Sequence, residues 1–176
     1  MEDIDSTAVL KEKLLAAGID EILAHGASDF SLRRVAAACG ASCAAPYKHF
    51  KNKDEFIREI ISYVEEKWEH LSEQIASSFD DPAERIAQLC IANVRFKIAN
   101  PLYGAERDSF DKEIASEIEK LCVENGYGGM EERIFAVTTL SAGTAALMES
   151  KRLNNCPKNF ELLHRRILAE LCAEEE

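Results

Sequence analysis

Apolar residues recur at steps of three and four along most of this chain, and no stretch alternates in the way typical of β-strands. The pattern therefore predicts an all-α fold. One broad apolar stripe predicts a long helix over 53–79, which ends at the Asp-Asp-Pro sequence of residues 80–82. Further helices are expected over 82–99, 106–124, 130–153 and 158–172.

Residues 30–56 predict a helix-turn-helix. Ser31 can cap a first helix whose apolar side is Leu32, Val35, Ala36 and Cys39, and Gly40 can end it in the left-handed conformation. Ser42 can then start a second helix of barely two turns, which runs to about residue 50 and begins with small residues. In helix-turn-helix proteins the N-terminal residues of such a helix meet base edges in the major groove.

This region resembles the N-terminal domain of TetR-family transcriptional regulators. The matching segments are LKEKLLAAGIDEILAHG, FSLRRVA, Gly40, and the pattern SxxxxYxHFxxK, which starts at Ser42. Pro46 departs from the Leu or Ile of many relatives, but it falls in the first helical turn, where a backbone donor has little use. The AAPYxHF version is similar to one branch of the family, and residues 94–110 resemble its FAxxNPxLY stretch. The later Trp-His-Gly motif of that branch is matched only at Gly143 and Leu147.

The resemblance implies a set of DNA-binding residues. It places the Tyr47 hydroxyl, the His49 ring and Lys53 on phosphates, and Arg33 on a base edge. The alternatives are a core role for Tyr47 and a solvated surface charge for Arg33. The full expected set is Ser31, Arg33, Arg34, Ser42, Cys43, Ala44, Tyr47, Lys48, His49 and Lys53.

The charge of the helix-turn-helix region differs from the charge of the whole chain. The formal net charge is −11, which by itself opposes contact with phosphates. However, six basic and three acidic residues lie between positions 28 and 58. Salt screens charges beyond roughly 8 Å, so the local excess of positive charge matters more than the total.

Several functional classes find no support in the sequence. The longest uncharged run, 134–148, has 15 residues, short of the ~20 that span a bilayer, and the first residues are acidic, so we expect a cytoplasmic protein without membrane contact. We find no HExxH, GxSxG, phosphate loop or Cys/His metal spacing, and we expect no enzyme activity, cofactor or metal. The six cysteines form no CxxC pair and are expected to be free thiols, most of them in the core, with a redox switch of Cys39 and Cys43 as the alternative for that pair.

We divide the chain into a helix-turn-helix DNA-binding domain, residues 1–54, and a helical domain for dimerisation and effector binding, residues 55–176. Small residues over 136–146 indicate close helix contact, either within the chain or in a two-fold dimer. Aromatic residues of the second domain could line an effector pocket, or could be ordinary core. These are Trp68, Phe96, Tyr103 and Phe110.

The leading hypothesis is a dimeric repressor that occupies a palindromic operator in double-stranded DNA and is released by an unknown small-molecule effector. A second hypothesis is a helical module for small-molecule binding or protein interaction with little DNA affinity. An enzyme is the third and least supported hypothesis.

Overall fold

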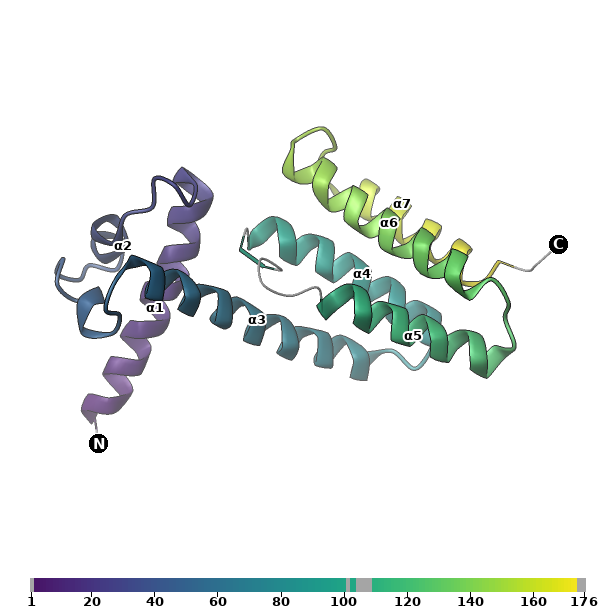
Figure 1. Ribbon diagram of the computed structural model, residues 1–176, viewed down its shortest axis with the longest axis horizontal. Helices are drawn as coiled ribbons and strands as arrows, with labels where there is room; N and C mark the ends of the chain where they lie inside the picture. Colours follow the sequence, from purple (N-terminus) through teal and green to yellow (C-terminus); the bar gives the residue numbers. More distant parts are fainter. Residues whose placement is uncertain (1, 101, 104–108, 174–176) are drawn as a thin grey trace. The chain divides into compact units, whose positions relative to one another are not determined.

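The computed structural model describes residues 2–100, 102–103 and 109–173, and every regular element in this part of the chain is helical (Figure 1). The all-α prediction is confirmed. No helix among these residues is long and apolar enough to cross a membrane. The elements are α1 (Glu2–His25), α2 (Leu32–Ala38), the 3-10 helix η1 (Pro46–Lys48), α3 (Lys53–Ser78), α4 (Pro82–Ala99), α5 (Ser109–Asn125), α6 (Met130–Glu149) and α7 (Pro157–Leu171).

Among the helices expected after residue 52, most bounds are confirmed within a few residues, and one is not. The helix expected over 130–153 ends at Glu149. The chain turns there because Lys151 adopts a left-handed backbone with φ 58°, and the Arg152 N–H donates to the Leu147 carbonyl at 2.9 Å. No glycine marks this end, so the sequence carried no stop signal. For the helix expected over 106–124, positions 106–108 lie outside the described residues.

The described residues form two compact units. The first contains the residues up to Lys67 together with Asn100, Leu102 and Tyr103, and the second contains Trp68 to Ala99 and the residues from Ser109 onward. The units therefore change within α3. This point lies later in the same helix than the boundary at 54/55 that the sequence suggested.

The core of the first unit is built around three phenylalanine rings. Phe50 packs edge-on against Phe56 with ring centroids 4.6 Å apart, and Phe30 lies 5.6 Å from Phe56. Gly18 lets α1 cross α3 closely, because a Cβ at this position would lie 2.6 Å from the Phe56 ring and 2.7 Å from Ile60. The aromatic cluster thus ties together the segments that precede and follow the expected DNA-reading residues.

The second unit is a bundle in which α4 contacts α5, α6 and α7 (Figure 1). Two of the cysteines, Cys90 and Cys122, are buried here, as expected of core thiols. The expectation that most of the cysteines lie in the core is wrong, because Cys39 and Cys156 are half-buried and Cys43 and Cys172 are exposed. The two exposed cysteines have a structural reason. These two positions lie at a turn and after the last helix, where the backbone leaves the apolar face.

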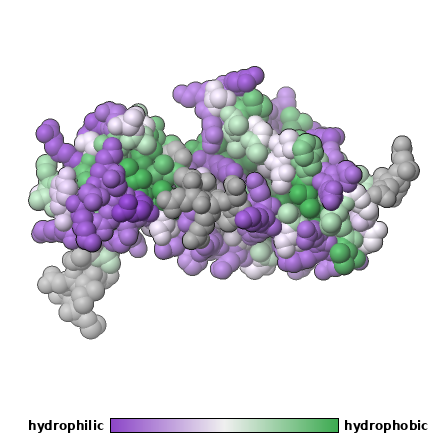
Figure 2. Space-filling view, in the orientation of Figure 1, coloured by the Kyte–Doolittle hydropathy of each residue, from purple (hydrophilic) through white to green (hydrophobic). Residues whose placement is uncertain are grey.

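The α6 helix is apolar or small on two opposite faces. Its inner face includes Val137, Ser141, Ala145 and Met148, all of which are buried. Its outer face is exposed, and Phe135 keeps 71% of its accessible surface. Figure 2 shows apolar patches among hydrophilic ones on the part of the surface where α6 runs. The remaining members of the outer face are Thr139, Ala142, Gly143, Ala146 and Leu147.

A buried arginine holds the end of α7. The Arg133 guanidinium, on a residue that is 6% exposed, donates to the carbonyls of Glu170 at 2.7 Å, Leu171 at 2.8 Å and Ala173 at 2.6 Å. Its Nε donates to the Gly128 carbonyl at 2.9 Å. The last carbonyls of a helix lack intrahelical partners and carry partial negative charge, so a cation is stabilising there.

We expect Arg133→Met to lower the free energy of unfolding by about 3 kcal/mol, because it removes four charge-assisted hydrogen bonds, of which the one to the Leu171 carbonyl is buried. Urea denaturation at neutral pH measures the change. The matched control is Arg166→Met on α7, whose side chain is 63% exposed and should cost less than about 1 kcal/mol. Equal losses in the two variants would contradict a role for Arg133 in holding α7.

Candidate nucleic-acid interface

The α2 helix begins and ends as its sequence predicts. Ser31 is the N-cap, and its hydroxyl accepts a hydrogen bond from the Arg34 N–H at 3.4 Å. Leu32, Val35 and Ala36 are buried on one side. Arg33 is exposed on the other side, away from the core, where it is free to meet a ligand.

The turn after α2 requires its glycine. Gly40 has φ 65°, and the Ala41 N–H donates to the Ala36 carbonyl at 2.9 Å. A Cβ at Gly40 would meet nothing within 4 Å, so the requirement comes from the backbone angle and not from crowding. The expectation that Gly40 ends the first helix is confirmed.

The second helix of the motif differs from the expectation. We expected a helix from Ser42 to about residue 50, but the chain forms a turn followed by the 3-10 helix η1. The cause is Pro46, which has no N–H to donate to the Ser42 carbonyl. The Ala45 N–H takes that carbonyl at 2.9 Å instead, which tightens the turn. Pro46 is therefore tolerated, as the resemblance to the family implied, but the segment forms a 3-10 helix instead of an α-helix.

We call residues 42–50 the reading segment. Its buried members are Ala45, Pro46 and Phe50, which attach it to the core. Tyr47 is 60% exposed, so the structure gives it no core role. His49 is half-buried, with its ring 5.9 Å from that of Phe50. The remaining members of the segment are exposed, and they are Ser42, Cys43, Ala44 and Lys48.

Hydrogen bonding within the reading segment explains how the proline is accommodated. The chain compensates for the missing donor through i to i−3 bonds at Ala45, Lys48 and His49. The Phe50 N–H still reaches the Pro46 carbonyl at 2.9 Å, so the segment rejoins the core with these backbone groups paired. The exposed face therefore keeps its small residues at the leading end.

Lys53 lies at the start of α3, as expected. Its Nζ is 3.3 Å from the Ala27 carbonyl and 5.5 Å from the centroid of the Phe30 ring. The helix is capped by Asn52, whose side-chain oxygen accepts from the Glu55 N–H at 2.8 Å, while the Glu55 carboxylate accepts from the Lys51 N–H at 2.6 Å. Sequence reasoning missed this cap, although an asparagine followed three residues later by a glutamate is its signature.

A buried carboxylate on α1 organises α2, and no sequence pattern indicated it. Glu21 is 8% exposed, and it accepts from the Ser31 N–H at 3.1 Å and from Arg34 Nε at 2.6 Å. The hydrogen bond from Arg34 lowers the pKa of Glu21, against the opposing effect of burial, and the Ser31 N–H lowers it further. Arg34 also donates to the Asp29 carbonyl. The structure thus gives Arg34 partners within the protein, unlike Arg33.

Three of the four residues expected to line an effector pocket lie together in the second unit. Trp68 packs on Phe96 and Phe110 in the second unit, with ring centroids 5.4 and 5.6 Å apart. Tyr103 belongs to the first unit, where its N–H donates to the Asn100 carbonyl at 2.9 Å. The second unit has a groove elsewhere, between α4 and α7, with a volume of about 700 Å³.

The two cysteines near the reading segment differ from each other. Cys39 is half-buried, its thiol lies 3.4 Å from the Lys13 carbonyl, and burial raises its pKa. Cys43 is an exposed free thiol. In the described part of the chain, no group of three or more histidine, cysteine, aspartate or glutamate residues is arranged to hold a metal.

Comparison with known proteins relates this arrangement to one family. Residues 14–60 match the model of the bacterial regulatory proteins of the tetR family. A transcriptional regulator from Rhodococcus sp. Rha1 shares the fold, with a TM-score of 0.65, 20% identity, and coverage of 92% of this chain and 93% of that one. The TetR family transcriptional regulator PfmR from Thermus thermophilus has a TM-score of 0.66, 20% identity, and coverage of 93% and 100%. No match was found among curated proteins.

We expect Glu21→Gln to destabilise the protein at neutral pH and to have little effect near pH 3. A carboxylate with a lowered pKa stabilises the folded state above its usual value of 4.5, and this stabilisation is lost as the pH falls through the lowered pKa. Urea denaturation of both proteins at the two pH values measures the difference. Glu12→Gln, an exposed position on the same helix, is the control. A gap between wild type and Glu21→Gln that does not change with pH would contradict the assignment.

Proposed function

We infer the function from one premise: the N-terminal region of the chain belongs to the tetR family of bacterial regulatory proteins, and the chain shares its fold with solved transcriptional regulators. It is a DNA-binding transcriptional regulator. Beyond this, we propose that it is a cytoplasmic, homodimeric, sequence-specific repressor. It binds a palindromic operator, and a small-molecule effector releases it from the DNA.

The observation that carries the DNA-binding proposal is the exposure of the reading segment, which lies just before Lys53 at the start of α3. Cys43 and Ala44 are small and exposed, so the backbone at this turn can approach base edges closely. Tyr47, Lys48 and His49 follow directly and supply hydrogen-bond donors for phosphates. Lys53 adds a cation at a helix N-terminus, which already favours anions.

The two arginines of α2 have different roles in this proposal. Arg33 is exposed, and we assign it to a base edge, where a guanidinium can bind guanine with two hydrogen bonds. Arg34 is bound to Glu21 at 2.5 Å and to Asp29, and we assign it to the support of α2. Ser31 and Ser42 remain candidates for phosphate contacts from the ends of the turn.

The outer face of α6 supports the proposal of a homodimer. An exposed phenylalanine and a row of small residues share that face, and small residues allow two helices to approach closely. A two-fold dimer would present two reading segments to half-sites roughly 34–36 Å apart, or a multiple of that distance. Effector binding in the second unit would then act on DNA affinity through the coupling free energy between the two sites.

Selection from a random pool of double-stranded DNA at physiological salt tests the proposal. We expect the wild type to enrich an inverted repeat and the Tyr47→Phe/Lys53→Ala double variant to enrich nothing, because that variant loses phosphate contacts on every sequence. Arg33→Ala should bind but lose preference at one position of each half-site, by about tenfold. No enrichment by the wild type would favour the second hypothesis, a helical binding module with little DNA affinity.

We expect Phe135→Glu to convert the dimer into monomers, because it places a charge in the proposed interface. Sedimentation velocity at micromolar concentration measures the oligomeric state. The control is Val123→Glu on α5, since Val123 is 81% exposed and lies on another helix. A Phe135→Glu protein that sediments as the wild type does would rule out this face as the interface.

A further inference from the structure

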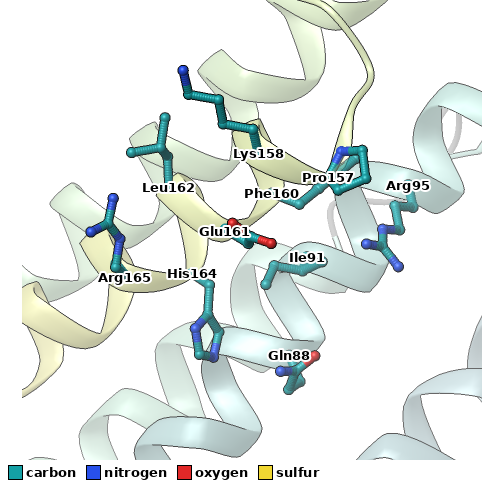
Figure 3. A pocket seen from close by; sticks show the side chains of 10 residues that line it. All are labelled: Gln88, Ile91, Arg95, Pro157, Lys158, Phe160, Glu161, Leu162, His164 and Arg165. Atoms are coloured by element: carbon teal, nitrogen blue, oxygen red, sulfur yellow. The ribbon is translucent and has the colours of Figure 1, made fainter.

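The groove between α4 and α7 has an apolar floor. Ile91 on α4 and Phe160 on α7 form it, and they are 7% and 6% exposed (Figure 3). Leu162 lies at the rim and is 41% exposed. The volume of about 700 Å³ falls in the range of pockets that take small molecules. The groove is therefore large enough for an organic ligand with an apolar body.

Three cations line the same groove in a chain whose net charge is −11. They are Arg95 on α4 and Lys158 and Arg165 on α7, and none of them makes an ion pair with any residue that the structure describes. One carboxylate, that of Glu161, belongs to the lining. The lining thus has an excess of unpaired positive charge that a bound anion would neutralise.

Arg95 is positioned for such a contact. Its guanidinium carbon lies 4.5 Å from the centroid of the Phe160 ring, and in Figure 3 the side chain reaches along the groove. A guanidinium over an aromatic ring still has N–H groups that can bind a carboxylate or phosphate with two hydrogen bonds. The same residue thus joins the apolar floor to the cationic rim.

The polar groups at the opposite end of the groove already have partners within the protein. His164 Nε2 lies 2.8 and 3.0 Å from the two carboxylate oxygens of Glu84, and the Gln88 amide donates to one of them at 2.7 Å. The bond from Gln88, together with that from His164, lowers the pKa of Glu84 against the effect of burial, so this carboxylate stays ionised. The charge available to a ligand therefore comes from the two arginines and the lysine.

We propose that the groove between α4 and α7 binds an amphipathic organic anion, with its carboxylate or phosphate group on Arg95 and its apolar body on Ile91 and Phe160. The anion site stands on the groove alone. Its use as the effector site rests on the proposed function. This site differs from the aromatic cluster of Trp68, Phe96 and Phe110, whose rings fill the space between them by packing on one another.

The test uses the full-length protein without DNA and a matched pair of fluorescent probes. The first is 8-anilinonaphthalene-1-sulfonate, and the second is N-phenyl-1-naphthylamine, which has the same apolar body and no charge. We expect Arg95→Gln to weaken binding of the sulfonate about tenfold, as loss of a charge-assisted contact implies. Glu161→Gln should strengthen it about threefold, because it removes the one carboxylate of the lining. Neither variant should change binding of the neutral probe.

Arg166→Gln, on the same helix but outside the groove lining, is the control and should bind both probes as the wild type does. Circular dichroism and a thermal unfolding scan establish that each variant is folded. Sulfonate affinity that is unchanged in both Arg95→Gln and Glu161→Gln would overturn the proposal. So would an equal response of the neutral probe to these substitutions, because charge would then play no part in binding.

Competition with decanoate, decyl phosphate and decanol identifies the head group. Displacement of the sulfonate by either anion, and not by decanol, supports the site and distinguishes a carboxylate from a phosphate ligand. Displacement by decanol at the same concentration would overturn it. On the selected operator, release of the wild type but not of Arg95→Gln by the competing anion would support the effector role. If the competing anion does not release the wild type from the operator, the effector role is rejected and the anion site is not. Failure to select any operator would count against the proposed function.

Discussion

The burial of three phenylalanine rings determines where the reading segment lies. Phe50 ends that segment and is 2% exposed, and it packs on Phe56 of α3, which also contacts Phe30 ahead of α2. The energetic weight of burying such rings is large, on the order of 2–3 kcal/mol each. The cluster joins Phe30, which precedes α2, to Phe50 and Phe56, which follow the turn. The exposed residues of the reading segment are therefore attached to the core at the end of the segment. A short turn can therefore present a defined set of side chains without a long helix to support it.

Charge in this protein is organised locally, in a chain that is acidic overall. In the first unit, Glu21 and Asp29 form ion pairs with Arg34. Arg33 and the lysines near the reading segment can therefore contact a ligand. In the second unit, Glu84 is paired with His164, and the arginines of the groove have no carboxylate partner among the described residues. Arg133 is held by carbonyls, where the C-terminal end of α7 supplies the negative potential. In each case the pairing within the protein decides which cations can meet a ligand.

The sequence by itself determined the all-α fold, most helix bounds and the place of the helix-turn-helix, because these depend on local chemistry. Ser31 caps, Gly40 turns, and Pro82 and Pro157 begin helices through backbone properties that neighbouring residues reveal. The 3-10 form of the second helix also has a local cause, because Pro46 has no N–H for the Ser42 carbonyl and the Ala45 N–H donates to it instead.

Only the tertiary structure showed the contacts between residues far apart in the chain. Glu21 meets Ser31 and Arg34 across two helices, Arg133 meets the end of α7, and Arg95 stacks on Phe160. Such pairs leave no periodic trace, because a polar side chain in a helix looks the same whether it faces solvent or a distant partner. Their formation depends on how the helices pack, and packing follows from the whole set of apolar faces at once.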